Sequence, residues 1–200
     1  MTQNGWDADY NSSKGALLAG NGTRPVVQSV GIDGQILLAD STQTTGLAWT
    51  SASLNSLFRA TADMDQPNVT GDFTLYTVVF ETTVIDVNGD YDNTTGIFTA
   101  PYDGYYLFTA SIGMSNLGAA HTTGKTIFLL NGSQYGASFR GNFYNVSDAS
   151  AELQTSISVT CSLSASDTFA VLFQVGGGTK TVGLLGNGIT SFTGYLIVAT

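Results

Sequence analysis

Residues 91–108 read Tyr91-Asp92-Asn93-Thr94-Thr95-Gly96-Ile97-Phe98-Thr99-Ala100-Pro101-Tyr102-Asp103-Gly104-Tyr105-Tyr106-Leu107-Phe108, and this stretch decides the fold. Pro101 and Gly104 predict a turn, because proline presets one backbone angle and glycine can adopt a positive φ. The aromatic alternation that follows predicts a central β-strand, since alternate side chains along a strand face opposite sides of a sheet.

The same β pattern continues from about residue 66 to the C-terminus. It predicts ten short strands, at Phe73–Phe80, Thr83–Val87, Gly96–Ala100, Tyr105–Ile112, Thr126–Leu130, Ala137–Tyr144, Thr155–Leu163, Thr168–Val175, Thr181–Leu185 and Phe192–Ala199. Turn-forming residues separate them, at Asn88-Gly89, Pro101–Gly104, Asn131-Gly132, Gly141-Asn142, Gly176–Gly178 and Asn187-Gly188. Because no helical pattern lies between these strands, we predict an all-β sandwich or barrel, for which a ten-stranded jelly-roll sandwich fits best.

Composition excludes several classes of function. The 200 residues are 42% hydrophobic and only 10% charged, with a net charge of −9. Six scattered Lys and Arg cannot form the basic stripe that nucleic-acid binding requires, and the same shortage disfavours an anionic membrane surface. No apolar run approaches the roughly 18–20 residues of a membrane span. We therefore expect neither binding of nucleic acid nor insertion into a membrane.

The shortage of charge also predicts self-association. Several predicted strands, for example Tyr76–Phe80 and Tyr105–Phe108, have apolar or aromatic residues on both faces. A sheet face that is apolar but does not meet its own core must meet another subunit. We therefore expect an oligomer closed by symmetry. The interface candidates are Tyr76, Val78, Phe80, Tyr106, Phe108, Phe192 and Tyr195.

The chain divides into three parts. Residues 1–50 are predicted to be a stalk or attachment segment, because their apolar patches of three or four residues are too short to bury themselves and need a partner surface. Residues 51–65 are predicted to be a linker, where Leu54, Leu57 and Phe58 have the spacing of a helical turn. Residues 66–200 are predicted to form the head.

From Phe73 onward the chain resembles the globular heads of the complement C-one-q / tumour-necrosis-factor superfamily. The family pattern Tyr-Asp, Thr-Gly-x-Phe, Pro-x-x-Gly and Tyr-x-Phe is complete within residues 91–108. Further matches are Leu130-Asn131-Gly132, Ser166-Asp167 and Ser191–Leu196. Ser166 stands where the family usually has glycine, and a cysteine common between Phe98 and Pro101 is absent. The resemblance implies a jelly roll that forms a tight homotrimer, and it says little about the ligand.

Residues 14–50 carry a second resemblance, to a module of tail-fibre and other virion proteins of bacteriophages. It rests on Lys14–Gly20, on the Gly-x-x-Gly-Gln-x-Leu core at Gly31–Leu37, and on Ala39–Trp49. This resemblance implies attachment to another virion protein. The N-terminus shows no secretory signal, which fits a virion part that assembles in the host cytoplasm and is exposed on the particle surface.

Four oxygen-bearing residues, Asp86, Asn88, Asp90 and Asp92, have the spacing that begins a calcium loop. An EF-hand is excluded, because Tyr91 replaces the glycine and Ile97 replaces the bidentate glutamate. Two interpretations stay open: an acidic hairpin loop, or a Ca²⁺ site of another kind. We expect no other cofactor.

A second cluster predicts a binding surface. Arg140, Asn142, Phe143 and Tyr144 combine aromatic faces with guanidinium and amide donors, which is what recognition of a sugar or receptor requires. The alternative is that this strand is an edge inside the trimer interface.

The sequence does not favour an enzyme. Cys161 falls in phase with apolar residues and is expected to be a buried thiol, while His121, the only histidine, lies in a loop. A polysaccharide hydrolase needs two carboxylates in a cleft, and the only glutamates, Glu81 and Glu152, have no evident partner.

Taken together, the composition and the two resemblances lead us to expect a trimeric virion fibre or spike that binds a host-surface receptor or glycan. A bacterial surface or matrix adhesin with the same head is the alternative.

Overall fold

The computed structural model describes residues 14–51, 55–142 and 151–200, in two units, Met1–Leu54 and Asn55–Thr200. All regular structure within these ranges is β-strand. Among the described residues there is no helix long and apolar enough to cross a membrane.

The N-terminal unit consists of two hairpins, β1 (Leu17–Gly20) with β2 (Pro25–Gln28) and β3 (Gln35–Ala39) with β4 (Leu47–Ser51). The Trp49 indole donates a hydrogen bond of 2.7 Å to the carbonyl oxygen of Ser29. A Cβ at Gly31 would lie 2.8 Å from the Trp49 ring, so only glycine allows this approach. The described residues from 14 to 50 are all exposed or half-buried, which agrees with the prediction that these patches cannot bury themselves.

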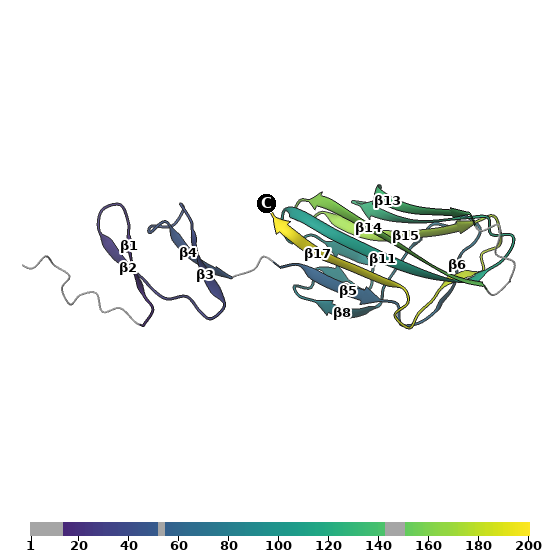
Figure 1. Cartoon of the computed structure of the whole chain (residues 1–200), viewed down its shortest axis with the longest axis horizontal. Coiled ribbons are helices and arrows are strands. Elements are labelled where there is room, and N and C mark those ends of the chain that lie inside the picture. Colours follow the sequence, from purple (N-terminus) through teal and green to yellow (C-terminus); the bar gives the residue numbers. More distant parts are fainter. Residues whose placement is uncertain (1–13, 52–54, 143–150) are drawn as a thin grey trace, which may run out of the picture. The chain divides into compact units, whose positions relative to one another are not determined.

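The head, residues Asn55–Thr200, is a sandwich of two antiparallel sheets (Figure 1). The first sheet consists of β13 (Ser133–Asn142), β12 (Thr123–Leu130), β15 (Thr168–Gly176), β10 (Ile97–Thr99) and β9 (Tyr91–Asp92), in that order, with β7 (Tyr76–Thr77) also paired to β15. The second consists of β6 (Gln66–Thr70), β16 (Val182–Leu184), β11 (Gly104–Leu117), β17 (Ser191–Ala199), β5 (Leu57–Thr61) and β8 (Thr82–Asp86), with β14 (Ala151–Leu163) also paired to β11.

The stretch at residues 91–108 supplies one edge of the first sheet and a central strand of the second. It forms β9, β10 and the start of β11, which pairs with β14 on one edge and with β17 on the other. Figure 1 shows β11 and β17 side by side along the head. The predicted turn at Pro101–Gly104 leads into β11 as expected.

Aromatic rings fill the space between the two sheets. Phe108 of β11 stacks on Phe169 of β15 with ring centroids 4.1 Å apart, so this contact joins one sheet to the other. The Tyr106 hydroxyl reaches the carbonyl oxygen of Tyr102 at 2.8 Å and is therefore satisfied although its ring is buried. The largest fully buried aromatic side chains are Phe58, Phe80, Phe98, Tyr106, Phe108, Phe128, Phe169, Phe173 and Phe192.

Each predicted head strand overlaps a strand of the structure, but three strands were missed: β5, β6 and β9. The predicted helical turn is wrong where the structure describes it, because Leu57 and Phe58 belong to β5, which pairs with β17 and β8. The head therefore begins before residue 66. Residue 54 lies outside the described residues. The pairing of β5 with two neighbouring strands outweighs the helical spacing of three apolar residues in the sequence.

Two expectations about turns also need correction. Gly104 does not adopt a positive φ; it is required because a Cβ there would lie 2.5 Å from the carbonyl oxygen of Val198. Gly141 and Asn142 lie inside β13 and not in a turn. The turn before β13 is the predicted Asn131-Gly132 pair, in which both residues have positive φ.

Ser166 occupies a backbone position that favours glycine. Its φ is +75°, a left-handed conformation that costs a non-glycine residue about 1–2 kcal/mol. This strain gives a physical reason why the resembled family usually carries glycine there.

We predict that Ser166→Gly stabilises the head by about 0.5–1 kcal/mol, because the relieved strain exceeds the extra chain entropy that glycine loses on folding. Urea unfolding measures the change. The control is Ser164→Gly, two residues earlier at a position without positive φ, which should give no gain. Equal effects of the two substitutions would contradict this account.

Candidate functional site

Five of the seven predicted interface residues belong to the core of a single protomer. Val78, Phe80, Tyr106, Phe108 and Phe192 are 0% exposed, so their side chains contact the opposite sheet and not another subunit. The sequence prediction was wrong for them because alternation identifies residues that share a face without showing which face meets the core. Tyr76 is half-buried and donates to the Gln66 side-chain oxygen at 2.8 Å, while Tyr195 is exposed.

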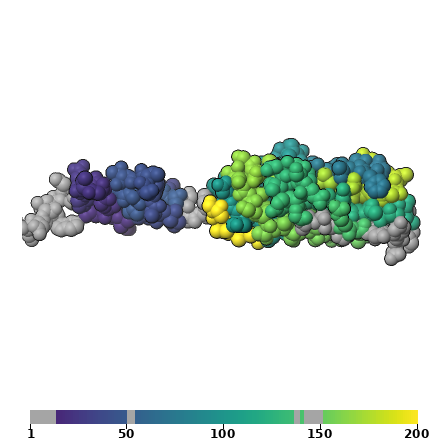
Figure 2. Space-filling model, turned by 90° about the horizontal axis from the view of Figure 1, so that it is seen from above, coloured from purple at the N-terminus to yellow at the C-terminus, as the bar shows by residue number. Residues whose placement is uncertain are grey.

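The outer face of the second sheet carries a neutral apolar patch. Tyr195 lies directly opposite Leu57 on β5 and Leu107 on β11, and Tyr105 follows two residues along the same face. Tyr105 is 47% exposed and Tyr195 is 40% exposed. We call Leu57, Tyr105, Leu107 and Tyr195 the β17 patch. In Figure 2 the yellow C-terminal segment is exposed at one end of the head.

On the β5 side of the β17 patch the face carries the exposed Arg59, two residues from Leu57. On the β14 side it is covered by uncharged hydroxyl groups. Ser111 on β11 contacts Ser156 on β14 at 3.1 Å and Gln154 at 2.8 Å. Thr109 donates to Ser158 at 3.2 Å. Because these groups already form hydrogen bonds with one another, contact with another protein surface would leave few polar atoms without a hydrogen-bond partner.

The first sheet carries a basic hollow of about 290 Å³. Its basic side chains come from neighbouring strands: Lys125 on β12 lies directly opposite Arg140 on β13, and on its other side it faces Gln174 on β15. The described lining residues, Thr123, Gly124, Lys125, Arg140, Gly141 and Gln174, include no Asp or Glu.

The hollow contains one residue of the predicted sugar-binding cluster, Arg140. The backbone of Asn142 lies at the end of β13, opposite Thr123, while Phe143 and Tyr144 lie outside the described residues. Sequence reasoning missed Lys125 and Gln174. The only available signal was the Asn131-Gly132 turn, which predicts that β12 and β13 pair.

In the acidic loop the carboxylates accept hydrogen bonds from the loop itself. Asp86 accepts from the backbone N–H groups of Gly89, Asp90 and Tyr91, each at 3.0 Å. Asp92 accepts from the backbone and hydroxyl of Thr94. These bonds keep the pKa of Asp92 at about 2, below its ordinary value of 3.8.

Two further members of the predicted calcium set, Asn88 and Asp90, bond to the segment just before β5 of the same chain. The Asp90 carboxylate accepts from the Ser56 hydroxyl at 2.7 Å, and the Asn88 amide donates to the carbonyl oxygen of Asn55. Within the described residues no group of three or more His, Cys, Asp or Glu is placed to hold a metal ion. The contacts are those of a hairpin loop closed by its own carboxylates.

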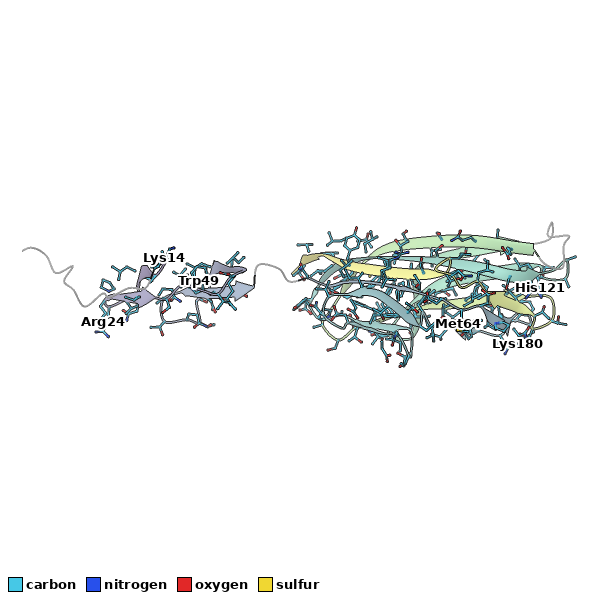
Figure 3. The ribbon with its side chains drawn as sticks, turned by 90° about the horizontal axis from the view of Figure 1, so that it is seen from below. Lys14, Arg24, Trp49, Met64, His121 and Lys180 are labelled. Atoms are coloured by element: carbon cyan, nitrogen blue, oxygen red, sulfur yellow. The ribbon has the colours of Figure 1, made fainter. Side chains whose placement is uncertain are left out.

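The side chains considered for catalysis have structural contacts. Burial raises the pKa of Cys161 to about 11, which disfavours the thiolate. The Nδ1 atom of His121 accepts from the Gly118 N–H at 2.9 Å, and its Nε2 lies 3.0 Å from the carbonyl oxygen of Thr179, so Nε2 carries the proton. Figure 3 shows His121 and Lys180 at the same end of the head. The Glu81 carboxylate accepts from the backbone N–H groups of a neighbouring loop at 2.9 and 3.1 Å.

Comparison with known proteins identifies the family. The family model of the C1q domain matches residues 58–197. The chain belongs to the C1q domain family. The globular domain of zebrafish complement 1qA is 18% identical over 72% of this chain and 99% of its own, with a TM-score of 0.53, which supports the fold alone. Murine APRIL is 11% identical over the same shares, with a TM-score of 0.49. No curated protein matches the chain.

The family model and the fold of the zebrafish domain confirm the predicted C1q-type jelly roll. They also explain why the stretch at residues 91–108 was decisive, since it lies inside the matched region. Fold membership does not define a ligand, because one fold carries many binding sites.

We predict that Asp92→Ala destabilises the head at neutral pH, and that the loss shrinks as pH falls. The pKa of Asp92 in the folded protein is about 2, below its ordinary value of 3.8. The ionised carboxylate therefore contributes its full stability at pH values above 3.8, and this contribution is lost as the pH falls through about 2. Thermal unfolding at pH 7, 4 and 2 checks this. The control Asp33→Ala removes an exposed carboxylate from the other unit. A loss for Asp92→Ala that is constant with pH would contradict the account.

Proposed function

We propose that this protein is a homotrimeric virion fibre or spike whose head binds a host-surface receptor or glycan. Residues 1–50 would attach it to another virion protein. The single observation that carries the proposal is the β17 patch, an apolar surface of four uncharged residues with two exposed tyrosines on a C1q-type head. The role is structural and adhesive, not enzymatic.

The β17 patch favours contact with further copies of the chain. Apolar surface is stabilised by leaving water, at roughly 25 cal/mol per Å². The two tyrosines present large apolar rings with a polar tip, which suits a subunit interface. The resemblance to complement-type heads supports three copies around one axis, so each patch residue would recur three times in the assembly.

The N-terminal unit supports attachment to a partner. Leu17, Leu18, Ile32 and Leu38 are exposed, and the two hairpins have no buried residue among those described. Ile32 is 77% exposed. Such a segment gains stability by packing on another protein, and its resemblance to bacteriophage tail-fibre modules supports a virion partner. Three heads on one assembly would then bind host-surface groups with avidity.

We predict that the purified full chain is a trimer at micromolar concentration and that Tyr195→Glu dissociates it. In a trimer each substitution would place three carboxylates against apolar surface, where unpaired charge is costly. Sedimentation velocity measures the mass. Leu75→Glu, at a residue 55% exposed in the loop before β7, is the control and should stay trimeric. A monomeric wild-type chain would overturn the proposal.

For the virion role, we predict that antibodies against the head label purified particles at a projecting appendage. Immunogold electron microscopy of virions and of host cell envelopes makes the comparison. Label confined to uninfected cell envelopes would favour the bacterial adhesin and contradict the virion fibre.

A further inference from the structure

We propose that the basic hollow on the first sheet binds the carboxylate of an acidic sugar. The inference rests on the proposed function, binding of a host-surface group by the head, and it names the class of ligand. Its residues are Lys125, Arg140, Gln174 and Thr123, on three adjacent strands.

The register of the sheet brings two positive charges together. Lys125 pairs directly with Arg140 across β12 and β13, and directly opposite residues in an antiparallel sheet have side chains on one face, with Cβ atoms about 4.5–5.5 Å apart. Residues 55–200 contain only four basic residues, Arg59, Lys125, Arg140 and Lys180. Half of the positive charge of an acidic head therefore lies at this one place.

A like-charge pair in this position destabilises the sheet unless something neutralises it. The described residues that line the hollow supply no carboxylate. A bound anion would replace the repulsion by two attractions. The pair is therefore better suited to holding a ligand than to stabilising the empty head.

The donors at the hollow match a planar carboxylate. The guanidinium of Arg140 offers a fixed fork of N–H groups, and the ammonium of Lys125 offers three further donors. Hydrogen bonds between ionised groups are stronger than hydrogen bonds between neutral groups, so both Lys125 and Arg140 should contribute to the affinity for a carboxylate.

Neutral groups around the basic pair suit the hydroxyls of a sugar. The side-chain amide nitrogen of Gln174 donates to the carbonyl oxygen of Phe73, and this bond fixes the side chain. The amide oxygen of Gln174 is then the atom that would accept a hydrogen bond from a ligand hydroxyl. The Thr123 hydroxyl can donate or accept. The volume of about 290 Å³ lies just below the usual range of small-molecule sites, about 300–1,000 Å³, and suits one sugar ring.

The test compares tetragalacturonic acid with its fully methyl-esterified form, since the two differ in their carboxylate charge. Calorimetric titration of the full-length protein at low salt should show the acid binding at least about tenfold tighter than the ester. Lys125→Gln with Arg140→Gln should weaken binding of the acid at least about tenfold. Arg140→Lys should give an intermediate loss, because it keeps the charge and removes the fork.

A matched control removes the same charge elsewhere. Lys14→Gln with Arg24→Gln changes two exposed basic residues of the N-terminal unit and should keep the affinity within about twofold. Both lie outside the head (Figure 3). The Lys125/Arg140 variant should melt no earlier than wild type, because it removes a like-charge pair, so a loss of binding is not a loss of folding.

Three results would overturn the inference: equal affinity for acid and ester, full binding by the Lys125/Arg140 variant, or binding of a sulfated oligosaccharide without the carboxylated one. Attachment to host cells separates this inference from the proposed function. If wild type and the Lys125/Arg140 variant attach equally, the carboxylate site is wrong and the attachment role stands. If the protein neither attaches nor occurs on particles, the proposed function fails whatever the sugar titration shows.

Discussion

The contact between Phe108 and Phe169 is the interaction on which the rest of the head depends. The rings stack with centroids 4.1 Å apart, and they belong to the central strands of opposite sheets. Around them the buried rings of Phe58, Phe98 and Phe192 have centroids 6.4, 5.2 and 5.8 Å from that of Phe108. Because one protomer fills its own interior in this way, the outer faces of the two sheets are left for contacts with other molecules.

The two outer faces differ in chemistry, and this difference separates assembly from recognition. The second sheet exposes the β17 patch and a row of hydroxyl groups that bond to one another, which suits contact with a second copy. The first sheet exposes Lys125 beside Arg140 in a hollow without a described carboxylate. Two of the four basic residues of the head line this hollow, while Arg59 lies exposed on the outer face of the second sheet, on β5.

The sequence was sufficient to predict the jelly roll, because the Tyr-x-Phe alternation, the Pro-x-x-Gly turn and the Asn-Gly turns all act locally. It was not sufficient to locate the basic hollow. Simple pairing outward from the Asn131-Gly132 turn would place Lys125 opposite Ser138. The irregularity between Ile127 and Phe128 shifts the register, so that Arg140 takes that place. For the same reason, alternation located the buried aromatic residues without showing that they face the core of their own protomer.

The most direct test of the account is an experimental structure of the purified protein as it assembles in solution, determined by electron microscopy or crystallography. The account predicts three copies around one axis, with Tyr105 and Tyr195 of each copy in contact with a neighbour and the Lys125 hollow open to solvent. Copies that meet through the first sheet, with Tyr195 exposed to water, would contradict it.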